Sequence, residues 1–162
     1  MRHPVVAIIG RPNVGKSTLF NRVLGARLAV VHDKPGITKD RHFALTEWNG
    51  RPFYLVDTGG FLPDIEVGIE AAVRRQAEMA LDASAVAVFM TDAKTGVTDL
   101  DGAIARSLLK RARPALLVVN KADNPRLPVE GEFYRLGLGE PIPISSEQGI
   151  NIGDLLDRVI AL

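Results

Sequence analysis

The sequence predicts an α/β fold: a doubly wound, mostly parallel sheet of six strands, with one antiparallel edge strand and about five flanking helices. Two observations support this prediction. Short apolar runs alternate along the chain with segments whose apolar residues recur at helical spacing. The pair Asn49-Gly50 separates two strand-like runs and predicts a hairpin, which places one antiparallel strand beside the parallel ones. At 162 residues the chain is expected to form a single domain with a sizeable core.

The first half of the chain begins with a strand that is buried on both faces. Residues 5–9 are continuously apolar, and residues 19–24 then place apolar side chains at helical spacing. The two hairpin strands are expected at 43–48 and 53–56. A helix is expected at about 65–81.

The second half continues the alternation of apolar strands and amphipathic helices. The expected elements are a strand at 85–90, a helix at 100–113, a strand at 115–119, a short helix near 130–136, a strand at 141–144 and a closing helix over 152–160. The helix at 100–113 is expected to end there because Pro114 cannot continue it. The carboxyl ends of the parallel strands form the edge at which such sheets bind ligands.

A phosphate-binding loop follows the first strand. Residues 10–18 read GRPNVGKST, which fits the pattern Gly-x-x-x-x-Gly-Lys-[Ser/Thr] without substitution. Its glycines allow backbone N–H groups to turn onto a phosphate chain, its lysine adds a positive charge, and its serine hydroxyl can ligate Mg²⁺. The helix that follows adds its dipole. The expected nucleotide contacts are Gly10, Arg11, Pro12, Asn13, Val14, Gly15, Lys16, Ser17 and Thr18.

A second motif indicates which base is bound. Residues 115–123 read ALLVVNKAD, an apolar strand that ends in Asn120-Lys121-Ala122-Asp123. The Asp123 carboxylate can accept hydrogen bonds from guanine N1–H and the 2-amino group, whereas adenine would leave it unpaired. Asn120 is expected to tie this loop to the phosphate loop, and the Lys121 stem to lie against the base. The two motifs together predict guanine specificity.

Two segments between these motifs are expected to sense the third phosphate. Asp57-Thr58-Gly59-Gly60 follows a strand, and we expect Asp57 to hold Mg²⁺ through water and Gly60 to donate its N–H to the γ-phosphate. The polar stretch 33–41 contains Thr38, whose hydroxyl could ligate Mg²⁺; the alternative is that Thr38 is an ordinary loop residue. A loop held only by such contacts would loosen after hydrolysis, as in a molecular switch.

These motifs, in this order and spacing, resemble the Era-like GTPases of the TRAFAC class. More narrowly, the chain is similar to the N-terminal GTPase domain of the EngA (Der) family of bacterial ribosome-assembly factors. The matching stretches are GRPNVGKSTLFNR (10–22), PGITKDR (35–41), EWNGRPFYLVDTGG (47–60), NKAD (120–123) and PISSEQGIN (143–151). The resemblance covers essentially the whole chain. It implies the P-loop NTPase G-domain fold and a GTP-hydrolysing switch that acts in large ribosomal subunit assembly in the cytoplasm.

The resemblance also implies roles for particular residues. Ser145 and Ser146, followed by Glu147, stand where the family reads guanine O6 through a backbone N–H; the usual family pattern is Ser-Ala, so Ser146 departs from it. Asn13 matches an asparagine that helps to coordinate K⁺ in potassium-activated relatives. Phe61 replaces a water-orienting glutamine of many signalling GTPases, which implies slow unaided hydrolysis. The residues expected to act in catalysis are Lys16, Thr38, Gly60 and Asn13, and the expected metal ligands are Ser17, Thr38 and Asp57 for Mg²⁺ and Asn13 for K⁺.

Composition restricts the partners. The formal net charge of +1 gives no global electrostatic case for nucleic-acid binding, and no run approaches the length of a membrane span, so neither DNA nor a membrane is an expected partner. The absence of cysteine excludes disulfides and is compatible with the cytoplasm. EngA-like proteins have a second GTPase domain and an RNA-binding-type domain. The chain is therefore expected to be the N-terminal fragment of a longer protein, whose missing parts would contact the ribosome or its RNA; the alternative is a small stand-alone GTPase.

Other interpretations stay open at this point. The domain could be a GTP-gated binding module with negligible turnover, or the GTPase domain of another Era-like protein, such as a tRNA-modification GTPase. A nucleoside monophosphate kinase would share the phosphate loop, but the NKAD motif argues against it. Three further expectations are structural: Asp92 is a cap or turn residue, Trp48 packs rather than stacking on RNA, and the basic run 110–113 is a solvated helix end.

Overall fold

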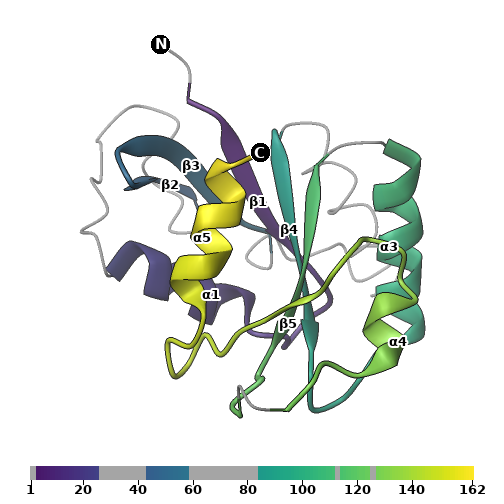
Figure 1. Ribbon diagram of the computed structural model, residues 1–162. Helices are drawn as coiled ribbons and strands as arrows, with labels where there is room; N and C mark the ends of the chain where they lie inside the picture. Colours follow the sequence, from purple (N-terminus) through teal and green to yellow (C-terminus); the bar gives the residue numbers. More distant parts are fainter. Residues whose placement is uncertain (1–2, 26–42, 59–83, 112–113, 125–126) are drawn as a thin grey trace.

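The computed structural model describes residues 3–25, 43–58, 84–111, 114–124 and 127–162 (Figure 1). Within them lies a six-stranded sheet of order β2-β3-β1-β4-β5-β6. The strands are β1 (Val5–Ile9), β2 (Phe43–Trp48), β3 (Arg51–Asp57), β4 (Val86–Asp92), β5 (Ala115–Asn120) and β6 (Ile142–Pro143). β2 pairs with β3 in antiparallel fashion and all other neighbours are parallel, which confirms the predicted fold class.

Helices cover both faces of the sheet in the described parts of the chain. They are α1 (Lys16–Gly25), α3 (Asp99–Arg111), α4 (Gly131–Tyr134) and α5 (Ile152–Ile160). Figure 1 shows α1 and α5 on one face and α3 with α4 on the other. A hydrophobic core lies on each face of the sheet, and alternate residues of β1 point into one or the other. Val6 and Ile8 pack with α1 and α5, whereas Ala7 and Ile9 pack with α3. The helix expected at 65–81 lies outside the described residues.

The β2–β3 hairpin turns at Asn49-Gly50, as the sequence predicts. Both residues have positive φ (51° and 78°), and Trp48 pairs with Arg51 across the turn, which is the geometry of a two-residue type I′ loop. The indole N–H of Trp48 donates to Asp157 Oδ1 at 2.7 Å and the ring packs against the core. The expectation that Trp48 is a packing residue is therefore confirmed.

Some element boundaries differ from the predicted ones. β3 begins at Arg51 rather than Phe53, although Pro52 cannot donate a hydrogen bond. Because β1 pairs with β3 only from Tyr54 onward, Pro52 lies where β3 has one neighbouring strand and the missing N–H costs little. β4 extends two residues beyond the predicted end, to Asp92, which lies opposite Asn120. This extension brings two polar segments to the same edge of the sheet.

Short elements also differ from their predicted lengths. α4 covers only Gly131–Tyr134, because the chain continues in tight turns with glycines of positive φ at 137 and 139. β6 has two residues. Among the residues that the structure describes, no helix is long and apolar enough to cross a membrane.

Candidate functional site

The loop between β1 and α1 needs glycine at two positions. A Cβ on Gly10 would lie 2.6 Å from the backbone oxygen of Met90, and a Cβ on Gly15 would lie 2.2 Å from Asn120 Nδ2. Gly15 also has a φ of 101°, which L side chains rarely adopt. Asn13 has a φ of 69°, a conformation that asparagine tolerates better than most residues. The loop is thus packed closely against the ends of β4 and β5.

Lys16, the first residue of α1, is buried beneath this loop. Its ammonium donates to the carbonyl oxygens of Gly10 (2.7 Å) and Arg11 (2.6 Å). Burial lowers the pKa of Lys16 to about 8, against the attraction of the nearby Asp57 carboxylate. The side chain therefore places a desolvated positive charge where the loop backbone turns.

Asn120 ties the end of β5 to the phosphate loop, as the sequence predicts, and it also contacts the segment after β6. Its side-chain amide donates to the carbonyl oxygen of Val14 at 2.9 Å, and its Oδ1 accepts from the N–H of Ser146 at 2.9 Å. Asn120 is 3% exposed. One buried side chain thus fixes the distance between two loops that are far apart in the sequence.

Four segments line a pocket of about 310 Å³. Its lining residues come from the phosphate loop with α1, the end of β4, the end of β5 and the segment after β6; they are Gly15, Thr18, Lys94, Asn120, Lys121, Asp123, Ser145 and Glu147. The pocket therefore gathers side chains that the sequence assigns to nucleotide binding. Lys94 also lines it, although sequence reasoning did not single it out.

The Asp123 carboxylate lies in this pocket with both oxygens in contact. The Ser145 hydroxyl donates to Oδ1 at 2.9 Å, and Lys94 Nζ lies 3.0 Å from Oδ2. Lys94, and then Ser145, lower the pKa of Asp123 below its usual value. Asp123 is therefore held as an anion by groups from two different loops.

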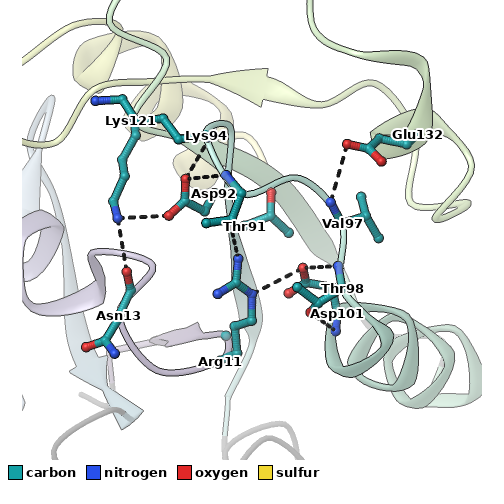
Figure 2. A network of polar contacts seen from close by, with 12 residues as sticks. Arg11, Asn13, Thr91, Asp92, Lys94, Val97, Thr98, Asp101, Lys121 and Glu132 are labelled. Carbon is teal, nitrogen blue, oxygen red and sulfur yellow. Dashed lines mark hydrogen bonds and ion pairs between the residues drawn. The ribbon is translucent and has the colours of Figure 1, made fainter.

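Lys121 is held by a second ion pair, drawn in Figure 2. Its ammonium lies 2.8 Å from Asp92 Oδ2 and donates to the carbonyl oxygen of Asn13 at 3.2 Å. The other Asp92 oxygen accepts the N–H groups of Lys94 and Thr95, which confirms the predicted turn role of Asp92. Burial alone would raise the pKa of Asp92, but Lys121 and these N–H groups together lower it.

Ser146 is placed differently from the simplest expectation. Its backbone N–H, expected to reach guanine O6, donates to Asn120 Oδ1 in this structure. Its hydroxyl oxygen is buried and has no hydrogen-bond partner among the described residues. The neighbouring Glu147 is exposed and lines the pocket.

The expected Mg²⁺ ligands lie partly within the described residues. Asp57 ends β3 and is 1% exposed, and it lies opposite Ile8 of β1 just before the phosphate loop. Ser17 is exposed in the first turn of α1. A carboxylate and a hydroxyl on the two sides of the loop are suitable oxygen ligands for Mg²⁺. Thr38, Gly60 and Phe61 lie outside the described residues.

Arg11 fastens the phosphate loop to the start of α3. Its guanidinium donates to Thr95 Oγ1 and lies 3.4 Å from Asp101 Oδ2 (Figure 2). Asp101 is fully buried and forms a capping box with Thr98 at the start of the helix. The side chain of Arg11 therefore points away from the pocket, and only its backbone stays in the loop.

Arg22 is a site residue that sequence reasoning missed. From α1 its guanidinium donates to the carbonyl oxygens of Ser146 and Glu147, 124 and 125 positions away in the sequence. A Cβ added to Gly149 would lie 3.0 Å from Arg22 Nη1, so the guanidinium lies close to this part of the chain. Arg22 thus fixes the segment after β6 to the helix that begins with Lys16. The only available signal was its place inside the GRPNVGKSTLFNR stretch.

Comparisons with known proteins agree with this geometry. Residues 5–121 match the family described as 50S ribosome-binding GTPase. The chain is 54% identical over 163 residues to GTPase Der of Moorella thermoacetica and 51% identical over 164 residues to GTPase Der of Ligilactobacillus salivarius. These matches cover 100% and 99% of this chain, but 37% of each relative. The chain therefore spans little more than a third of the length of these curated relatives.

Solved structures of Era have the same fold. Era in complex with MgGDPNP and nucleotides 1506–1542 of 16S ribosomal RNA superposes with a TM-score of 0.73 at 27% identity, over 99% of this chain and 57% of that one. A variant of Aquifex aeolicus Era bound to GDP.AlF4- superposes with a TM-score of 0.71 at 29% identity, over the same shares of the two chains.

Proposed function

The chain belongs to the family of 50S ribosome-binding GTPases, and from this premise we propose that it is a switch domain that binds guanine nucleotides and hydrolyses GTP. The observation that carries the proposal is the double hydrogen bond of Asn120. It joins Val14 of the phosphate loop to Ser146 beside Asp123, around one pocket. A mononucleotide has a phosphate end and a base end, and this arrangement offers a binding element for each at a fixed distance.

Asp123 would select guanine. Its ionised carboxylate accepts from N1–H and from the 2-amino group, and adenine offers neither donor at those positions. The stem of Lys121, held by Asp92 and the Asn13 carbonyl, would lie against one face of the base. A backbone N–H of Ser146 or Glu147 would serve guanine O6. Because the Ser146 N–H already donates to Asn120 Oδ1, a contact of this group with O6 requires a shared hydrogen bond, whereas a contact from Glu147 does not.

The phosphate end would be bound mainly by residues 10–18. Lys16, now bonded to two loop carbonyls, would turn its ammonium to the β- and γ-phosphates. Ser17, Thr38 and Asp57 would hold Mg²⁺, and Asn13 would contribute to a K⁺ site. When bound, these ions neutralise charge on the phosphates. Gly60 would donate its N–H to the γ-phosphate while a water attacks the phosphorus and GDP leaves.

The cellular role that these similarities favour is assembly of the large ribosomal subunit in the cytoplasm. The matched family is described as 50S ribosome-binding, and the Der proteins share about half of their matched residues with this chain. The chain covers only 37% of those proteins, so we expect ribosome or ribosomal RNA contacts to involve segments that are not part of this sequence.

Nucleotide turnover in two salts tests the proposal. GTP and ATP are incubated with the protein and Mg²⁺, in K⁺ and in Na⁺ at equal ionic strength. We expect turnover of GTP alone, faster in K⁺. Asn13→Gly should abolish the potassium effect while GDP binding is retained, because glycine keeps the positive φ and removes only the amide. Equal use of ATP would contradict the base assignment, and potassium stimulation retained in Asn13→Gly would remove Asn13 from the ion site.

A further inference from the structure

The end of β4 and the end of β5 carry the same three residues in opposite order. Asp92-Ala93-Lys94 leaves β4, and Lys121-Ala122-Asp123 leaves β5 beside it. The strands are parallel with Asp92 opposite Asn120, and the N–H of Ala93 donates to the Asn120 carbonyl at 2.9 Å. The acidic residue of each segment therefore meets the basic residue of the other.

The resulting two ion pairs have different environments. The Asp92–Lys121 pair is 2.8 Å long and its carboxylate is 2% exposed. The Lys94–Asp123 pair is 3.0 Å long, with side chains 65% and 35% exposed. The carboxylate of the first pair is buried, and Figure 2 shows that its lysine also bonds to the Asn13 carbonyl of the phosphate loop. The second pair lies at the mouth of the pocket, on the carboxylate that would read the base.

The contacts of Asp123 leave room for two more donors. Ser145 Oγ occupies one lone pair of Oδ1, and Lys94 Nζ occupies one lone pair of Oδ2. Each carboxylate oxygen can accept two hydrogen bonds, so one acceptor position remains on each oxygen. Contacts to both oxygens also fix the plane of the carboxylate. Guanine presents two parallel donors, N1–H and the 2-amino group, which need two acceptors in one plane.

We propose that Lys94 is a positioning residue for guanine recognition: through its ion pair it holds the Asp123 carboxylate in the orientation that accepts both guanine donors. The inference rests on the function proposed above. Lys94 acts through Asp123 and need not touch the base. The effect of replacing Lys94 must therefore disappear when residue 123 is no longer a carboxylate. A general effect of Lys94 on folding or surface charge would be the same whichever residue stands at 123.

A double-mutant cycle on nucleotide binding separates these possibilities. Dissociation constants are measured for GDP with the wild type and Lys94→Met, and for XDP with Asp123→Asn and the double variant. Methionine keeps the length of the lysine stem without the charge. Lys110→Met removes an exposed lysine of α3 that does not line the pocket and serves as the control.

Lys94→Met should weaken GDP binding about three- to fivefold, the upper part of the range measured for exposed ion pairs, because the pair fixes the carboxylate that receives both guanine donors. The loss should shrink in high salt, because the pair is accessible to ions. The same substitution should leave XDP binding by the Asp123→Asn variant unchanged, since a neutral amide no longer needs the ammonium. Lys110→Met should have no effect on either nucleotide.

Three results would overturn the role of Lys94: an equal loss in both backgrounds, no loss of GDP binding, or tighter GDP binding. The last would make Lys94 a competitor of guanine for Asp123. Failure of the proposed function is recognised separately, because then the wild type would not prefer GDP over ADP or Asp123→Asn would not gain XDP binding.

Discussion

Replacing Asn120 with alanine removes a buried side chain that hydrogen-bonds to both halves of the site. The change deletes the donor to the Val14 carbonyl and the acceptor for the Ser146 N–H, both 2.9 Å away. Val14 and Ser146 are 0% and 1% exposed, so water does not readily replace the lost partner. The substitution therefore leaves two buried backbone groups unpaired.

The cost follows from those two groups. A buried polar group without a partner costs about 1–3 kcal/mol, so Asn120→Ala should lower the free energy of unfolding by about 2–6 kcal/mol. That is a large part of the roughly 5–15 kcal/mol that stabilises a typical domain. Asn21→Ala, at an exposed position of α1, is the matched control and should change the free energy by less than about 0.5 kcal/mol.

Urea unfolding without nucleotide measures this difference. The protein has one tryptophan, Trp48, which contacts α5 and so reports on the hairpin and the helix together. The midpoint should fall strongly for Asn120→Ala and stay unchanged for Asn21→Ala. If Asn120→Ala were as stable as the control, the buried bridge between the loops would not exist in solution and the geometry of the site would have to be revised.

Three further predictions concern the loops. Gly15→Ala should destabilise the protein by about 2 kcal/mol or more and abolish GDP binding, since its Cβ would lie 2.2 Å from Asn120 Nδ2. A urea midpoint and a GDP affinity equal to those of the wild type would contradict this. Arg22→Met should speed GDP dissociation about tenfold, because the Ser146 carbonyl loses a charged donor, and an unchanged rate of fluorescent GDP release would exclude this role. The pKa of Lys16 is about 8 in the folded protein and near 10.5 in the unfolded chain. Between these pH values the unfolded chain binds the proton more strongly, so the free energy of unfolding rises with pH. The free energy of unfolding of the wild type relative to Lys16→Met should therefore increase from about pH 8 toward 10.5, and a constant difference would contradict a buried ammonium.

The sequence predicted those features whose cause is local. Asn49-Gly50 specifies its hairpin because both residues accept positive φ, and the phosphate loop is recognisable because its glycines and lysine are close in the chain. In both cases, residue type and spacing alone limit the possible structures. The contact of Asn120 with the phosphate loop was also predicted although it spans 106 positions, because the phosphate-loop and NKAD motifs occur together in this chain.

The contacts that were missed join residues far apart in the sequence. Arg22 and Ser146 are separated by 124 positions, and nothing near Arg22 shows which loop α1 will face. Lys94 was overlooked because its partner depends on the register of β4 on β5, and β4 ends two residues later than predicted. Asp92 was identified as a turn residue, which is correct, but its ion pair with Lys121 depends on that same register.

Single-turnover hydrolysis, with the protein in excess over radiolabelled GTP in K⁺ and Mg²⁺, tests the central claim most directly. The account predicts slow, complete conversion of bound GTP to GDP and phosphate, with loss of conversion in Lys16→Ala. If GTP were instead bound tightly and recovered intact, the domain would be a nucleotide-gated binding module, and the assignment of hydrolysis to this chain would be wrong.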